Sequence, residues 1–93
     1  MLPITLRPDG RRAVIVGGGN VAARKVESLI GAGFPVFVVA ERIVDSLRVL
    51  LTEHEGECVE RPYQRGDLEG AALVIAATDD PAVNERVVAD ARA

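Results

Sequence analysis

The run Gly17-Gly18-Gly19 constrains the fold of this chain more than any other feature. It follows Val14-Ile15-Val16, an apolar, β-branched segment that is typical of a strand buried on both faces. A segment with helical periodicity begins directly after the glycines. With Ala22 three residues further on, the spacing fits the pattern G-x-G-x-x-G/A, in which a strand turns sharply into a helix.

This glycine pattern is the usual signature of dinucleotide binding. Gly17 would allow the tight turn, Gly19 would let the backbone approach a pyrophosphate, and Ala22 would keep the helix close to the sheet. The phosphates would meet free N–H groups at the positive end of the helix dipole. A tight turn that binds nothing is the alternative. Because strand and helix lie where the signature requires them, we predict a cofactor site at Gly17, Gly18 and Gly19, with Asn20 contacting phosphate or capping the helix.

Polar residues follow two further strands of the predicted sheet. Glu41 ends the second strand, where its carboxylate could accept hydrogen bonds from ribose hydroxyls, which favours NAD over its phosphorylated form. Arg42 beside it could instead accommodate a 2′-phosphate, and both side chains could simply be solvated. Thr78 follows the fourth strand, where it could line the cofactor site or satisfy backbone groups at the strand end.

The whole chain alternates strands with helices. The pattern predicts strands over 13–16, 35–40, 58–61 and 72–77, helices over 20–32, 43–51 and from 81 onward, and a turn over 65–70. A short extended piece over 2–6 and a turn over 8–10 come first. This order predicts an α/β fold: a Rossmann-like open parallel sheet of about four strands with helices on both faces. The buried stripe expected for the last helix consists of Val83, Val87, Val88 and Ala91.

Composition excludes several classes of function. A net charge of −3 and only three aromatic residues leave no basic or stacking surface for nucleic acid. Cys58 is the only cysteine and His54 the only histidine, so neither a metal site nor a Cys/His nucleophile is predicted. The first residues lack a signal-peptide pattern, and no apolar run approaches the roughly 20 residues that span a bilayer. We therefore expect no membrane contact and a cytoplasmic location.

The sequence offers no convincing catalytic residue. Asp79 and Asp80 could suggest acid–base chemistry, but Pro81 follows them, and aspartate before proline is the usual start of a helix. We therefore interpret this pair as a helix cap, and the catalytic residue remains unknown.

Several motifs, taken in order, resemble a known family. They are Leu2-Pro3-Ile4, the run from Val16 to Lys25, and Ile75 to Asp80 followed by Val83-Asn84. This set resembles the amino-terminal dehydrogenase module of siroheme synthase, which also occurs as stand-alone precorrin-2 dehydrogenase. The segments Arg61-Pro62-Tyr63 and Gly66-Asp67-Leu68 are similar too, so the resemblance covers essentially the whole chain. It implies oxidation of precorrin-2 to sirohydrochlorin with NAD, joined in some members by insertion of ferrous iron.

The resemblance also implies roles for particular residues and partners. It places Asn20 and Val21 at the cofactor-binding turn and Glu41-Arg42 at a second cofactor-binding segment. It implies a tetrapyrrole substrate, a homodimer and a catalytic aspartate in a strand beyond residue 93. We therefore expect residues 1–93 to be an incomplete NAD-binding domain that lacks the dimerisation region and the methyltransferase domain of fused members. A regulatory nucleotide-binding module without catalysis and a truncated product without function are the alternatives.

Overall fold

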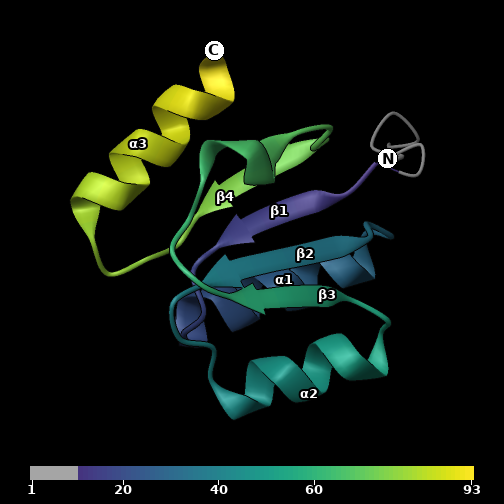
Figure 1. Cartoon of the computed structure of the whole chain (residues 1–93). Helices are drawn as coiled ribbons and strands as arrows, with labels where there is room; N and C mark the ends of the chain where they lie inside the picture. Colours follow the sequence, from purple (N-terminus) through teal and green to yellow (C-terminus); the bar gives the residue numbers. More distant parts are fainter. Residues whose placement is uncertain (1–10) are drawn as a thin grey trace.

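The chain folds into one parallel sheet flanked by helices (Figure 1). The computed structural model describes residues 11–93, so the extended piece and the turn expected within 2–10 lie outside the described residues. The strands are β1 (Ala13–Val16), β2 (Val36–Ala40), β3 (Glu57–Glu60) and β4 (Leu73–Ala76), in the order β3-β2-β1-β4. The helices are α1 (Asn20–Gly31), α2 (Asp45–Glu53) and α3 (Pro81–Arg92), and the turn over 65–70 contains a 3₁₀ helix, η2 (Arg65–Leu68). The predicted α/β fold is confirmed.

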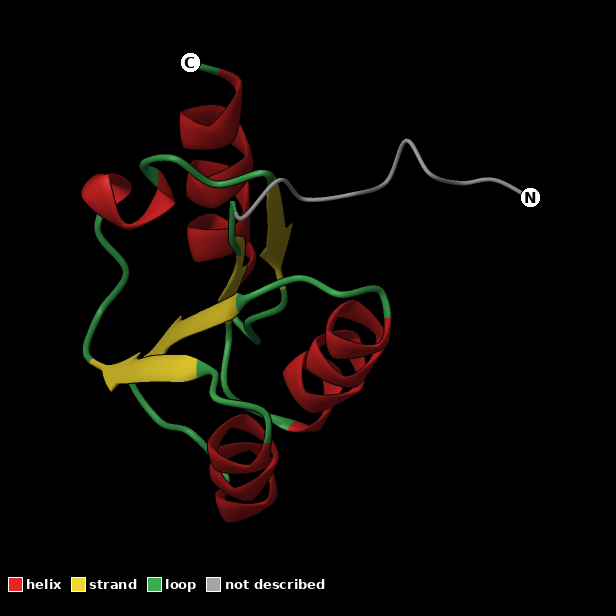
Figure 2. Ribbon diagram, turned by 90° about the vertical axis from the view of Figure 1, so that its right-hand side faces the viewer, coloured by secondary structure: helices red, strands yellow, loops and turns green. Residues whose placement is uncertain are grey.

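The parallel register brings the carboxyl ends of the strands to one edge of the sheet. Strand β1 pairs with β2 from Ala13 opposite Val36 and with β4 from Ala13 opposite Leu73. Helices α1 and α2 cover one face, whereas α3 and η2 lie side by side on the other (Figures 1 and 2). The loops that leave β1, β2 and β4 therefore meet at the same edge, where open α/β sheets bind their ligands.

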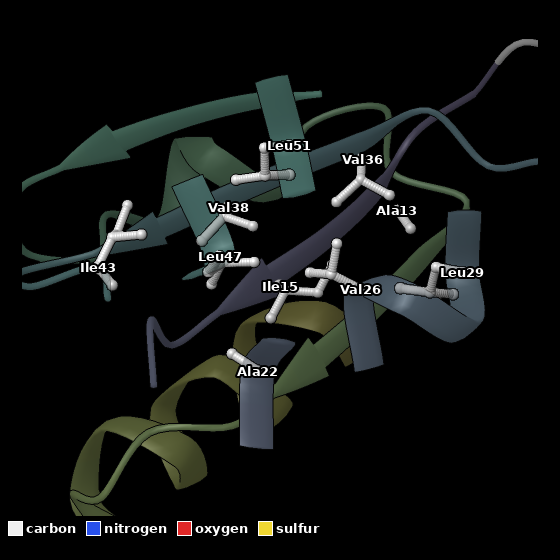
Figure 3. Packing of buried hydrophobic residues seen from close by; sticks show 11 residues of the cluster. Ala13, Ile15, Ala22, Val26, Leu29, Val36, Val38, Ile43, Leu47 and Leu51 are labelled. Atoms are coloured by element: carbon white, nitrogen blue, oxygen red, sulfur yellow. The ribbon is translucent and has the colours of Figure 1, made fainter. Parts of the chain in front are cut away.

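The larger of two hydrophobic clusters lies between the sheet and helices α1 and α2 (Figure 3). Ile15, Val26 and Leu47 are completely buried at its centre, as the stripe pattern of the two helices predicts. The smaller cluster lies under α3 and η2 and consists of Val14, Val16, Val39, Tyr63 and Val87. Strand β1 contributes to both clusters in alternation, because successive side chains of a strand point to opposite faces.

The prediction for the last helix is only partly right. Val87 of α3 is fully buried and Val83 half-buried, but Val88 is 44% exposed and Ala91 is exposed as well. Helix α3 covers β4, which forms one edge of the sheet, so only one side of the helix meets apolar neighbours within residues 11–93. Strand β4 is correspondingly less buried than β1, with Leu73 39% exposed. No helix of these residues is both long and apolar enough to cross a membrane.

One buried carboxylate organises the connection between β3 and β4. Asp67 of η2 is 7% exposed and accepts two hydrogen bonds from the Arg61 guanidinium, at 2.9 and 2.5 Å. Its Oδ2 also accepts from the backbone N–H of Gln64 at 2.8 Å, which closes a capping box at the start of η2. The bonds from Arg61 and then from Gln64 hold the pKa of Asp67 below its usual value of 3.8, against the opposing effect of burial.

This lowered pKa predicts an acid-sensitive fold. The contribution of Asp67 to the free energy of unfolding is fully present above pH 3.8, its ordinary value, and is lost as the pH falls through its lower value in the folded chain. We expect the midpoint of urea unfolding to decrease from about pH 5 to about pH 2 more steeply in the unchanged chain than in Asp67→Asn. Equal slopes in the two proteins would show that the Arg61–Asp67 pair does not stabilise the folded state.

Candidate functional site

The glycine turn, Gly17 to Gly19, lies between the loops that follow β2 and β4 and is in close contact with both. A Cβ on Gly17 would lie 2.3 Å from the carbonyl oxygen of Ala77, and Gly17 has φ +142°, which disfavours any other residue. A Cβ on Gly18 would lie 2.0 Å from the carbonyl oxygen of Arg42, on the opposite side. The Val44 N–H also donates to the Gly18 carbonyl at 2.9 Å. These two glycines therefore allow both loops to approach the turn closely.

Gly19 has a different environment from its two neighbours. A Cβ on Gly19 would meet no atom within 4 Å, and the residue lines a cavity of about 660 Å³. Gly19 is the N-cap of α1, and no side chain caps the helix there. The N–H groups of the first turn, Asn20 to Ala22, therefore have no partner within the helix. They stand at the positive end of the helix dipole, which attracts an anion.

This cavity runs along the carboxyl edge of the sheet, where the three loops meet. Its size is in the usual range for small-molecule and cofactor sites. Its wall is made by the glycine turn, the loop after β2, the loop after β4 and the segment after β3. Among the lining residues are Gly18, Gly19, Asn20, Val21, Glu41, Arg42, Val44, Pro62, Tyr63, Thr78, Asp79, Asp80, Val83 and Arg86.

The loop after β2 is held in place by Glu60 at the end of β3. One oxygen of Glu60 accepts from the Ile43 N–H at 3.1 Å, and the other pairs with Arg48 of α2. The bond from Arg48 is the main cause of the lowered pKa of Glu60, and the bond from Ile43 adds to it. Glu41 and Arg42 precede this anchor and are exposed at the cavity. Both side chains are therefore free to turn toward a bound molecule.

The loop after β4 is fixed by Asn84 of α3. The Thr78 N–H donates to Asn84 Oδ1 at 3.1 Å, and Asn84 Nδ2 donates back to the Thr78 carbonyl at 3.1 Å. The Thr78 hydroxyl also donates to Asn84 Oδ1 at 2.6 Å. Asp80 caps α3 by accepting from the Ala82 N–H at 2.9 Å, with Pro81 next to it, so its predicted capping role is confirmed. Asn84 thus sets the position of Thr78 on the cavity wall.

An aromatic residue supports the β4 side of the cavity. Tyr63 is 7% exposed, and its hydroxyl donates to Asp90 of α3 at 2.7 Å. Burial, with this hydrogen bond as a further cause, raises the pKa of Tyr63 to about 12, so the phenol keeps its proton at neutral pH. Arg86 of α3 lies over the ring, with its guanidinium carbon 5.2 Å from the ring centroid.

Comparison with known proteins agrees with this geometry. Residues 4–93 match the model of a protein family with the description "Putative NAD(P)-binding". The chain belongs to this NAD(P)-binding family. The siroheme synthase of Azotobacter vinelandii is 47% identical over 90 residues, which cover 97% of this chain and 19% of the relative. The siroheme synthase of Pseudomonas aeruginosa strain UCBPP-PA14 is 49% identical over 86 residues, 92% of this chain and 18% of the relative.

A solved structure gives the same result for the fold. The protein named "SirC, precorrin-2 dehydrogenase" superimposes with a TM-score of 0.80 and 25% sequence identity over 95% of this chain and 43% of the other. The predicted resemblance to siroheme synthase and precorrin-2 dehydrogenase is confirmed by these relatives and this structure. The chain spans about a fifth of the length of the curated relatives described above.

The residues predicted for the cofactor site come together in the NAD(P)-binding domain. Of these eight, all except Gly17 line the cavity. Gly17 lies against the Ala77 carbonyl instead, so its close contact is with the loop after β4 and not with the cavity. Asn20 is the first residue of α1 and makes no capping bond, which rules out the capping alternative for it. The cradle fits a dinucleotide, because unpaired N–H groups of α1 border an open cavity at the only glycine of the three with free space around it. Contacts from individual residues to the cofactor stay predictions.

The sequence pattern predicts Gly18 but does not separate it from the other two glycines, and it assigns no site role to three further residues. Gly18 had no role of its own, although a third glycine inside the pattern signals a second close contact. Asn84 and Tyr63 were noted only as parts of a resemblance, and Arg86 was not noted at all. Tyr63 and Arg86 act through contacts between segments 23 and 27 residues apart, so their spacing in the chain carries no signal for them, whereas Asn84 contacts Thr78 only six residues away.

Proposed function

We propose that this chain is the NAD-binding module of a precorrin-2 dehydrogenase, which oxidises precorrin-2 to sirohydrochlorin in siroheme biosynthesis. The observation that carries the proposal is the glycine turn, which opens at Gly19 onto a cavity of about 660 Å³. Two findings support the choice of reaction. Relatives with 47% identity are named siroheme synthases, and the similar solved structure is named a precorrin-2 dehydrogenase.

The residues of the chain would bind and orient the cofactor. The N–H groups at the start of α1 would hold the pyrophosphate, with Gly19 leaving room for it. Glu41 would accept hydrogen bonds from a ribose hydroxyl, which favours NAD over its phosphorylated form, and Arg42 would lie beside the same ribose. Thr78 would line the cavity on the β4 side of the glycine turn, opposite Glu41 and Arg42. When bound, NAD supplies the acceptor for the hydride that the substrate loses.

The proposal assigns the catalytic group to the rest of the protein. Of the carboxylates on the cavity wall, Asp80 is committed to capping α3, and nothing places Asp79 opposite a substrate. We further propose a cytoplasmic location and, as the resemblance implies, a homodimer. The mass of the full-length protein in solution, measured by light scattering, tests the dimer directly.

The reaction is tested with the full-length protein, purified precorrin-2 and either NAD or NADP. We expect NADH absorbance to appear with NAD and kcat/KM to be at least ~10-fold lower with NADP, a difference of about 1.4 kcal/mol. Binding of NAD without turnover would instead support a regulatory module. If calorimetry shows that the protein binds neither nucleotide, the proposed cofactor site itself is wrong.

A further inference from the structure

Arg86 is a cation on the cavity wall that the proposed cofactor site does not use. It projects from α3 and lines the cavity with Thr78, Asp79 and Val83. Because the sheet order is β3-β2-β1-β4, this β4 side lies across the glycine turn from Glu41 and Arg42. If Glu41 binds the adenosine ribose, the β4 side of the cavity holds the nicotinamide half of the dinucleotide and the substrate that reacts with it.

The guanidinium of Arg86 is held in place but keeps free donors. It lies over the Tyr63 ring, and one nitrogen, Nη2, donates to the Tyr63 carbonyl at 3.3 Å. Tyr63 is itself fixed by its hydrogen bond to Asp90. Within residues 11–93, no carboxylate forms an ion pair with Arg86, although Asp79 and Asp80 share the cavity wall and Asp90 lies one turn along the helix.

A guanidinium in this state is suited to bind an anion. It has five N–H donors in a rigid plane, of which the structure uses one, and carboxylates match this plane with two parallel hydrogen bonds. Its two contacts with Tyr63 reduce the side-chain entropy that binding would cost. Because the N–H groups at the start of α1 would already hold the pyrophosphate, the anion at Arg86 is a separate group.

We propose that Arg86 binds a carboxylate of the substrate that undergoes oxidation and thereby orients this substrate beside the nicotinamide. Arg86 is then a residue that determines substrate specificity, positioned by Tyr63 and Asp90. This inference rests on the proposed function, because it takes the cavity to be a dinucleotide site. It predicts that the affinity for the tetrapyrrole depends on Arg86, whereas the affinity for NAD does not.

The test uses the full-length protein with the variants Arg86→Gln and Arg86→Lys. Arg92→Gln is the matched control, since Arg92 is exposed in the last turn of the same helix and does not line the cavity. Two properties are measured: the Kd of sirohydrochlorin, the product, by fluorescence titration, and the Kd of NAD by calorimetry. We expect Arg86→Gln to weaken sirohydrochlorin binding at least ~10-fold, or about 1.4 kcal/mol. We expect Arg86→Lys to recover part of this loss, and NAD binding to change less than ~2-fold in every variant.

Three outcomes would overturn the inference. Equal losses of NAD and sirohydrochlorin binding would show that Arg86 contacts a phosphate of the cofactor. Unchanged binding of both would show that Arg86 only supports Tyr63. A loss in Arg92→Gln as large as that in Arg86→Gln would show an effect of net charge alone. If sirohydrochlorin binding depends on Arg86 but the unchanged protein does not oxidise precorrin-2, the proposed reaction fails and the carboxylate site stands.

Discussion

Gly18→Ala is expected to lower the free energy of unfolding by about 3 kcal/mol, the upper part of the range for overpacked sites. The new methyl carbon would lie 2.0 Å from the Arg42 carbonyl oxygen and 2.9 Å from the Ile43 Cα. Both are backbone atoms, so they cannot move aside as the end of a flexible side chain can. Moving the loop would also break the bond from the Val44 N–H to the Gly18 carbonyl. Thermal unfolding followed by circular dichroism should show a decrease in Tm of roughly 12 to 24 °C.

The matched control for this prediction is Gly19→Ala, one residue along the chain. A Cβ there meets no atom within 4 Å, and Gly19 has ordinary extended backbone angles, with φ −97° and ψ −162°. We expect a loss of about 1 kcal/mol or less, because alanine is a poorer N-cap than glycine. Equal decreases in Tm for the two variants would contradict the idea that the loop after β2 closes on Gly18.

Gly19→Arg is expected to weaken NAD binding by at least ~100-fold, about 2.8 kcal/mol, while the chain stays folded. Gly19 borders the cavity at the start of α1, so a long side chain would occupy the space in which the pyrophosphate meets the free N–H groups. Isothermal titration with NAD measures the effect directly. Gly19→Ala should fall between the unchanged chain and Gly19→Arg, because a single methyl group takes up less of that space.

A second arginine variant separates the position from the charge. Gly31→Arg adds the same side chain at the last residue of α1, where a Cβ also meets no atom within 4 Å. Gly31 does not line the cavity, so we expect NAD binding close to that of the unchanged chain. If Gly31→Arg weakens binding as much as Gly19→Arg does, the loss reflects net charge and the assigned site is wrong. Unchanged binding in Gly19→Arg would also contradict the site.

Local sequence patterns were sufficient to predict most of the fold. Strand β1 and the start of α1 lie at the predicted residues, because an apolar β-branched run, a glycine turn and a helical stripe act over a few neighbours. Gly33, two residues beyond the end of α1, has φ +89°, a conformation that favours glycine at a helix end. The prediction that Val88 and Ala91 of α3 are buried was wrong, because an apolar residue is buried only if another element covers it.

The sequence alone was enough to identify the glycine turn, the α/β fold, the family and the residue types expected at the cavity, since these depend on spacing within short segments. Only the tertiary structure could assign separate tasks to the three glycines: Gly17 accommodates the loop after β4, Gly18 the loop after β2, and Gly19 the open cavity. The same holds for Arg86, which lines the cavity and lies over Tyr63 from the segment after β3. The physical reason is that these close approaches, and the contact between Arg86 and Tyr63, join segments 23 to 60 residues apart, and no local periodicity predicts how those segments meet.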